Sequence, residues 1–583
     1  MQLNKSILAT TIALSMGVLT ACGGSDSSSP ETAPETAPTN SAPTDVVLSN
    51  TTVDENTANA VVGTLSAVDA DASDTHTYSV AGEQFVVDGD SLKLAEGVIL
   101  EADDVDSLEL TVELTVTDNN SGSFTKEVTL TINDLMDRYA FNSKFDEEKS
   151  SVSYTGQTAR HILIAELNDY IKNGLEDDID SGKLTDKASV LAALNSLYIP
   201  DEKTQYDDIA ISFIDNAKHG LVSDITGYKN LKDKVAGNDA KGQSKDWNNG
   251  EFAGYANKGV LSPSLLIDTL FDNLATNAAE KINGVVRKDV FGEDITKVYI
   301  DKHGVDLAQF IQKFLLMSIT YSQASNDYFG IDTEGKGLTT DNINPAKEGA
   351  AYTSLEHQFD EGFGYFGAAR NYLEYSDVEI AGKVSDDNGR AAWNGSHDTD
   401  GDGKIDLRSE YNFGQSVNAA KRDLGTADNA AATDYTTQAM TAFIAGRQLI
   451  NDNVGNELTE EQFKELKDYT QKGLDGWERA IVATVIHYIN DLSADLTLLA
   501  NSDAEFNFND TAKHYSEMKG FALGLQFSEY AGISDENFEK VHQLMRDAPE
   551  LTGDVEAYID DLAAARKILQ DSYELNEENV AGW

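Results

Sequence analysis

Two sets of residues between Ser354 and Asp423 have the types and the spacing to bind metal ions. In the stretch H-D-T-D-G-D-G-K-I-D, aspartates alternate at positions 398, 400 and 402, and Gly403 follows them. A short loop with this spacing can wrap carboxylate oxygens around a calcium ion. His357 and Glu361 are four residues apart on a predicted helix, so both side chains project from one face. We therefore expect the chemistry of the chain to lie in this stretch.

The calcium loop is predicted over residues 398–410. In an EF-type loop a bidentate Glu is expected at the twelfth position, where Ser409 stands, and Glu410 follows one residue late. This departure predicts a structural calcium site rather than a tight sensor site, with Glu410 reaching in. The alternative is an acidic surface turn. The candidate calcium ligands are Asp398, Asp400, Asp402, the backbone carbonyl of Lys404, Asp406 and Glu410.

A second pattern of metal-binding type links two predicted helices. His514 and Glu517 are three residues apart, which repeats the spacing of His357 and Asp360, and the surrounding residues suggest a faint internal duplication. Facing helices that project His and carboxylates inward build transition-metal sites, so His357, Glu361, His514 and Glu517 are candidate ligands for iron or a similar ion. His161 and His487 are further candidates. The alternative is that each histidine is a core residue whose ring is satisfied by a carboxylate.

Protease and hydrolase motifs are absent from the sequence. H-Q-F-D-E lacks the second histidine and the base of H-E-x-x-H, and no G-x-S-x-G frames a serine. The residues therefore favour a protein that is not an enzyme. A hydrolase with a Ser/His/Asp triad remains an alternative.

The elements that must position these residues change in type along the chain. Residues 45–136 alternate polar and apolar positions with period two, which predicts a small antiparallel β-sandwich of about seven strands. From residue 139 to 583, apolar residues recur at i, i+3, i+4 and i+7, which predicts a large, mostly α-helical bundle domain of about a dozen helices. The fold class is therefore multidomain, with an all-β domain followed by an α domain that contains the loop.

The N-terminal residues carry a targeting pattern. Residues 1–21 have a basic start and a short apolar run, which is typical of a signal peptide, and residues 22–44 form a tether rich in Ser, Thr and Pro. Leu19-Thr20-Ala21-Cys22 resembles the lipobox of bacterial lipoproteins, which implies that Cys22 is acylated. Gly23 implies, by the same resemblance, an outer-membrane location in the cell envelope, with the lipid as the contact to the membrane. The alternative is an ordinary secreted protein.

Composition excludes several function classes. Asp and Glu number 100 against 44 Lys and Arg, giving a formal charge of -56, which argues against nucleic acid as a partner because nucleic acid is a polyanion. The single cysteine allows no intrachain disulfide and no Cys-based zinc or iron-sulfur site.

The β region also resembles a bacterial cadherin-like repeat. The resemblance covers about 90 residues and depends on V-D-E-N, G-T-L, A-V-D-A-D, L-T-V-T-D and the closing I-N-D. It implies calcium ligands, or neighbours of ligands, at Glu55, Asp69, Asp71, Asp118, Asn133 and Asp134. The family's L-D-x-E motif is represented by L-E-A-D with its acids rearranged, which gives Asp103 as a further candidate. Cadherin calcium sites lie between consecutive repeats, and this chain has one repeat.

The helical region resembles an uncharacterised family of helical surface-lipoprotein domains through S-S-V-S-Y-T-G-Q-T-A-R-H, S-L-E-H-Q-F-D-E-G-F-G-Y-F-G and H-Y-S-E-M-K-G-F-A-L-G-L-Q-F. That resemblance implies no activity. More loosely, the paired helices are similar to the imelysin-like proteins, which are linked with iron uptake. We therefore expect a calcium-binding envelope lipoprotein for surface adhesion or ligand capture, with a cell-surface protein or polysaccharide as ligand. The alternative is an imelysin-like component of iron acquisition.

Overall fold

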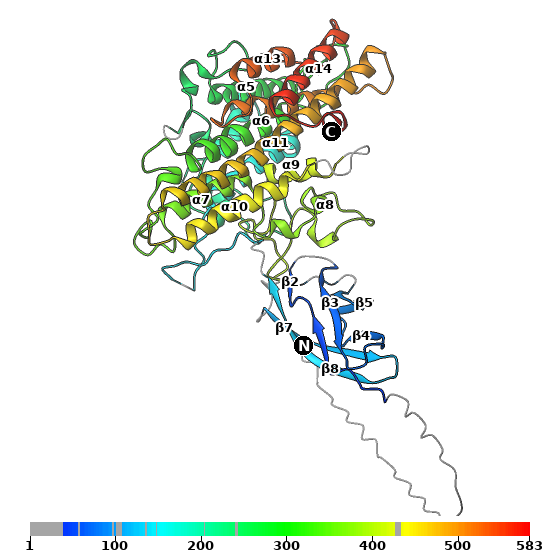
Figure 1. Cartoon of the computed structure of the whole chain (residues 1–583). Coiled ribbons are helices and arrows are strands. Elements are labelled where there is room, and N and C mark those ends of the chain that lie inside the picture. Colours follow the sequence, from blue (N-terminus) through cyan, green and yellow to red (C-terminus); the bar gives the residue numbers. More distant parts are fainter. Residues whose placement is uncertain are drawn as a thin grey trace, which may run out of the picture. The chain divides into compact units, whose positions relative to one another are not determined.

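The computed structural model describes residues 39–583 except 56–58, 96–97, 99, 101–107, 134–136, 147, 203, 240–242 and 426–432 (Figure 1). The chain divides into two compact units, Met1–Leu135 and Met136–Trp583. The described strands at 45–133 precede a mostly helical region, which confirms the predicted order of a β region and an α region. Across the described residues, no helix combines the length and the apolar character needed to cross a membrane. Cys22, Asp103 and Asp134 lie outside the described residues.

The β unit contains two four-stranded sheets, ordered β1-β3-β6-β5 and β2-β8-β7-β4. One buried apolar cluster draws side chains from both sheets, for example Leu92 from the first and Val112 and Leu114 from the second. The strands are β1 Asp45–Leu48, β2 Thr52–Asp54, β3 Val61–Val68, β4 His76–Val80, β5 Phe85–Asp88, β6 Ser91–Leu94, β7 Glu109–Asp118 and β8 Ser123–Asn133.

One pair of strands departs from the predicted antiparallel arrangement. β2 pairs with β8 in parallel, with Asp54 opposite Asn133, whereas every other paired strand of the described residues is antiparallel. β2 is only three residues long. Alternation of polar and apolar residues shows which face of a strand is buried, and it does not show the direction of the strand relative to its partner, so this pairing could not be predicted from the sequence.

The helical unit has fifteen α-helices among its described residues, joined by short 3-10 and π turns. They are α1 Thr155–Asp169, α2 Leu175–Asp180, α3 Lys187–Tyr198, α4 Val222–Ile225, α5 Pro263–Ile282, α6 Leu307–Leu315, α7 Ser354–Phe366, α8 Asp377–Ile380, α9 Gly414–Asp423, α10 Tyr435–Asp452, α11 Glu460–Ala500, α12 Phe508–Ala522, α13 Asp535–Met545, α14 Val555–Ser572 and α15 Glu577–Gly582.

The long helix α11 is central to the packing of this unit and lies beside α10, α12, α9 and α14 (Figure 1). Its start is fixed by a capping box between Thr459 and Gln462. Gly473 lets α10 approach closely, because an added Cβ would lie 2.4 Å from the Phe443 ring. This close approach fixes the position of α10 and therefore of its polar side chains.

The helix α7 begins and ends on clear local signals. Thr353 caps its first turn through a capping box with Glu356, and Gly367 ends it with a φ of 81°. Gly362 and Gly364 pack against Phe329 and Tyr154, where an added Cβ would lie within 2.7 Å of a side-chain atom. The run of glycines and aromatics in this helix therefore serves close helix packing.

Candidate functional site

The predicted calcium loop brings three carboxylates together. Asp398, Asp400 and Glu410 each offer one oxygen, and these atoms lie within 4.8 Å of one another. The Asp398 carboxylate accepts hydrogen bonds from the backbone N–H groups of Asp402 at 3.1 Å and Gly403 at 2.7 Å, which curl the loop around it. Carboxylate oxygens are of the type that calcium takes as ligands, and calcium takes about six to eight oxygens in all.

The side chain of Glu410 is buried beneath the loop and binds its backbone. Its side chain is 2% exposed, and its two oxygens accept hydrogen bonds from the backbone N–H of Thr399 at 2.8 Å and of Asp406 at 2.7 Å. The carboxylate one residue beyond Ser409 therefore lies beside the predicted ligands Asp398 and Asp400. Ile405, which lies between Asp400 and Glu410 in the sequence, is 4% exposed and anchors the loop to the core.

Another predicted ligand, Asp406, has a partner outside this cluster. Asp406 pairs with Arg408, with 2.6 Å between Oδ2 and Nη2. Burial acts to raise the pKa of Asp406, but the Arg408 hydrogen bonds outweigh it and hold that pKa below its usual value. The amide of Lys404, whose carbonyl is the predicted ligand, donates to Oδ1 of Asp402, another predicted ligand, at 2.8 Å.

Lys218 contacts the loop from a distant part of the sequence. Its Nζ lies 2.7 Å from Oδ2 of Asp400 and 2.7 Å from Oδ2 of Asp402, and these two carboxylates raise its pKa. The Lys218 amide also donates to the carbonyl of Ile405 at 2.9 Å. A cation arriving at Asp400 would therefore compete with the Lys218 ammonium. Sequence reasoning missed this residue, because nothing local marks it.

In the β unit, three aspartates meet at the end formed by the β3–β4 and β7–β8 connections. Oxygens of Asp69, Asp74 and Asp118 lie within 4.8 Å of one another. Hydrogen bonds from the Asp71 amide and His76 lower the pKa of Asp69, and those from Asn40 and from backbone amides lower that of Asp118. Asp74 was not predicted, whereas the Asp71 carboxylate accepts from the amide of Ser41 at 2.6 Å.

The other cadherin-like candidates lie at the opposite end of β8. Asn133 is its last residue and pairs with Asp54, beside Glu55, whereas Ser123 at its start pairs with Thr117, next to Asp118. An eleven-residue strand separates its ends by roughly 33 Å at about 3.3 Å per residue. The predicted ligands therefore form two separate groups, which cannot share an ion.

His357 and Glu361 lie near each other on α7, as predicted. Nδ1 of His357 donates to the carbonyl of Ser153 at 3.0 Å, and Nε2 lies 3.8 Å from Oε2 of Glu361. The His357 ring stacks on Tyr352 with 4.7 Å between centroids. Oε1 of Glu361 accepts from Gln157 at 3.0 Å.

His514 has partners on α11 instead of α7. Its Nδ1 lies 2.8 Å from Asp495, and Asp491 lies 3.9 Å from its Nε2 and 3.3 Å from Nε2 of His487. Burial acts to lower the pKa of His514, but the Asp495 hydrogen bond outweighs it and raises that pKa. Burial and the nearby Arg422 lower the pKa of His487 to about 3.

Glu517 forms an ion pair with Lys313, with 3.3 Å between Nζ and Oε1. Within the part of the chain that the structure describes, none of His357, Glu361, His514 and Glu517 belongs to a close group of three possible metal ligands. A shared iron site of these four residues stays a prediction.

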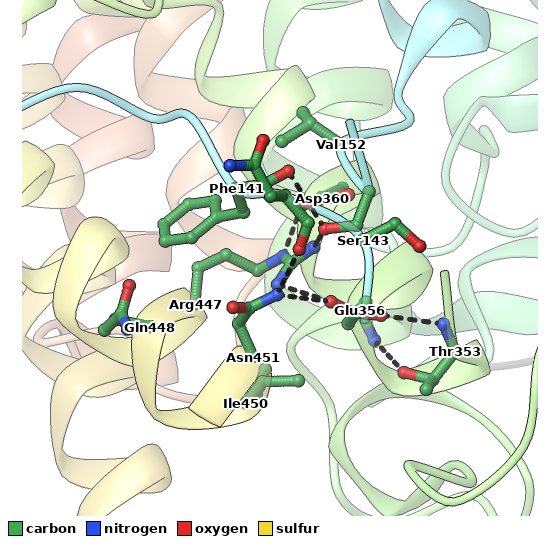
Figure 2. A network of polar contacts seen from close by, with 12 residues as sticks. Phe141, Ser143, Val152, Thr353, Glu356, Asp360, Arg447, Gln448, Ile450 and Asn451 are labelled. Carbon is green, nitrogen blue, oxygen red and sulfur yellow. Dashed lines mark hydrogen bonds and ion pairs between the residues drawn. The ribbon is translucent and has the colours of Figure 1, made fainter. Parts of the chain in front are cut away.

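Two acids that flank His357 on α7 form a buried network with Arg447 of α10 (Figure 2). The Arg447 guanidinium lies 2.8 Å from Oδ1 of Asp360 and 3.0 Å from Oε1 of Glu356, and all three side chains are 0% exposed. The remaining donors come from several segments: Tyr139 Oη at 2.9 Å and the Ser153 amide at 2.9 Å to Asp360, and the Thr353 amide at 2.8 Å and Asn451 Nδ2 at 3.1 Å to Glu356.

The network ties α7 and α10 to the segment at 139–153. Each charged side chain in the network has an opposite charge within 3.0 Å. We call the network a clamp, because it holds these three segments together and its charged groups are already paired. Sequence reasoning considered His357, Asp360 and Glu361 and missed Glu356, which lies four residues before Asp360 on the inward face. The available signal was Arg447 within the apolar helix sequence A-F-I-A-G-R-Q-L-I.

Comparison with known proteins finds a family match for one part of the chain. No curated protein matches it. Residues 137–377 match the family described as Domain of unknown function (DUF4856), a match that includes Glu356 and Asp360 and ends before the loop at 398–410.

Proposed function

We propose that the chain is a non-enzymatic lipoprotein of the cell envelope that binds calcium and serves in surface adhesion or ligand capture. The observation that carries the proposal is the cluster of Asp398, Asp400 and buried Glu410, whose oxygens lie within 4.8 Å of one another. Calcium prefers several carboxylate and carbonyl oxygens in a flexible loop, which these residues can supply. The formal charge of -56 favours divalent cations near the chain.

Calcium in this loop would have a structural role. The loop is joined to residues 216–218 through hydrogen bonds between Ile405 and the backbone of Asn216 and Lys218, at 3.0 and 2.9 Å. An ion that holds Asp398, Asp400 and Glu410 together would stabilise this junction. A second calcium position is proposed at Asp69, Asp74 and Asp118 in the β unit.

The proposed location depends on Cys22, whose acylation would hold the chain at the membrane. We expect Cys22→Ser to abolish incorporation of radiolabelled palmitate into the protein, because the thiol that would be acylated is lost. Immunoprecipitation from cells grown with the label measures this. No labelling of the wild type, or equal labelling of the wild type and Cys22→Ser, would contradict the lipoprotein assignment.

The calcium proposal is tested by thermal unfolding of the full chain in calcium and in EGTA. A ligand that binds only the folded state at about 100 times its Kd stabilises it by about 2.7 kcal/mol, so calcium should raise Tm by a few degrees. In Asp398→Asn/Asp400→Asn this rise should shrink. The matched control is Asp386→Asn/Asp387→Asn, because both residues are exposed and lie outside the cluster.

If the double variant keeps the full calcium-dependent rise in Tm, the loop is not the site. The arrangement favours calcium over iron acquisition, because His357 and Glu361 lie beside each other whereas His514 and Glu517 have other partners, Asp495 and Lys313.

A further inference from the structure

A cavity of about 240 Å³ lies among α1, α6, α9 and α12 of the helical unit. The residues that line it include aliphatic and amide side chains and two lysines, Lys313 and Lys421. The aromatic side chains in its walls are those of His161, Phe213, Tyr411, Phe413 and Phe521. No Asp or Glu lines it. Four other cavities of the helical unit each have at least one Asp or Glu in their lining, so this cavity differs from them.

Lys421 has no hydrogen bond or ion pair with any residue that the structure describes, although its side chain is partly buried. The other lysine differs. Nζ of Lys313 donates to Gln312 at 2.8 Å and lies 3.3 Å from Glu517. Glu517 therefore lies within ion-pair distance of Lys313, whereas no described carboxylate lies within that distance of Lys421. An ammonium in such a position is costly unless an anion joins it.

The other residues that line the cavity suit the apolar part of a ligand. The Phe413 ring stacks on His161 at 5.0 Å between centroids and lies 4.6 Å from Tyr411. Nε2 of His161 donates to the carbonyl of Gly364 at 3.1 Å, and burial lowers its pKa to about 4, so this ring is neutral at pH 7. The cavity thus combines aromatic walls with two lysines, of which Lys313 has Glu517 as its partner.

We infer that this cavity binds a small organic anion, a carboxylate with an aromatic or compact apolar body, whose charge pairs with Lys421. The inference deepens the proposed role in ligand capture by naming a class of ligand. Pockets of this kind combine mostly apolar walls with a few polar groups that fix orientation. Burial of a charge-paired carboxylate against rings would give both affinity and selectivity over neutral analogues.

The charges around Lys421 add a dependence on pH. Burial, and then the positive charges of Lys313, Lys383 and Arg422, lower the pKa of Lys421 to about 8, while Glu517 acts weakly in the opposite direction. Lys421 is therefore charged below pH 8 and loses its proton above it, whereas a carboxylate ligand stays ionised. Binding should be strong at pH 7 and should fall as the pH rises through about 8.

The test uses benzoate as the probe, with benzyl alcohol as its neutral counterpart, in equilibrium dialysis against the full chain in EGTA. We expect saturable benzoate binding at pH 7 that weakens about tenfold or more in Lys421→Met, since a hydrogen bond to a charged group is lost. Benzyl alcohol should bind weakly to both proteins. The matched control is Lys464→Met, whose side chain is 73% exposed and lies on α11.

Three results would overturn the inference: no saturable benzoate binding to the wild type, equal binding by folded Lys421→Met, or equal binding by the wild type at pH 7 and pH 9.5. The last comparison needs no variant, so it stands even if Lys421→Met fails to fold. Because EGTA removes calcium, benzoate binding and calcium binding succeed or fail separately.

Discussion

Replacing Arg447 with methionine should lower the free energy of unfolding of the helical unit by about 3–5 kcal/mol. The substitution keeps much of the side-chain volume but leaves Glu356 and Asp360 buried at 0% exposure without their cation. The desolvation cost of an unpaired buried carboxylate is large in a medium of low dielectric constant. Urea unfolding followed by tryptophan fluorescence measures this change, because all four tryptophans lie in the helical unit.

The matched control is Lys567→Met, which removes an exposed ion pair with Asp571 and should cost less than about 1 kcal/mol. Arg447→Met combined with Glu356→Gln and Asp360→Asn should recover part of the lost stability, since no unpaired charge then remains buried. An Arg447→Met protein as stable as the control would contradict the role of the network as a clamp.

Replacing Glu410 with glutamine should weaken calcium binding by about 100-fold, because the loop loses the charge of its most buried ligand. The calcium-free protein should also lose about 1–3 kcal/mol of stability. Both Glu410 oxygens accept from backbone N–H groups, those of Thr399 and Asp406, and an amide NH₂ would face one of these donors. Calorimetric titration with calcium and urea unfolding in EGTA measure the two effects.

The matched control is Glu334→Gln, an exposed residue outside the acidic cluster, which should change neither quantity. Unchanged calcium affinity in Glu410→Gln would show that this carboxylate is not a ligand. Unchanged stability in EGTA would show that its two backbone hydrogen bonds contribute little.

Features encoded by neighbouring residues could be predicted from the sequence. Period-two alternation predicted β7, where Val112, Leu114 and Val116 are buried and the residues between them are more exposed. The alternate aspartates at 398 and 400 predicted two members of the acidic cluster, and the late Glu410 was recognised as a residue that could reach in. In each case the physical cause is local, because strand pleat and turn geometry depend on a few successive residues.

Features that depend on distant residues could not be predicted. Lys218 meets Asp400 across 182 positions, and Arg447 meets Asp360 across 87, so no spacing rule connects them. The two histidine pairs have similar spacing, yet His357 lies against Ser153 and His514 against Asp495. Packing against neighbouring elements decides which face of a helix is buried. These neighbours are distant in the sequence, so the spacing of residues within the helix does not identify them.

Calcium binding by the loop at 398–410 is the central claim, and counting the bound ions tests it most directly. Equilibrium dialysis of the full chain against calcium, with the metal measured by atomic absorption, should give one fewer bound ion per chain in Asp398→Asn/Asp400→Asn than in the wild type. The control Asp386→Asn/Asp387→Asn should match the wild type. Equal calcium content in the wild type and the loop variant would contradict the claim.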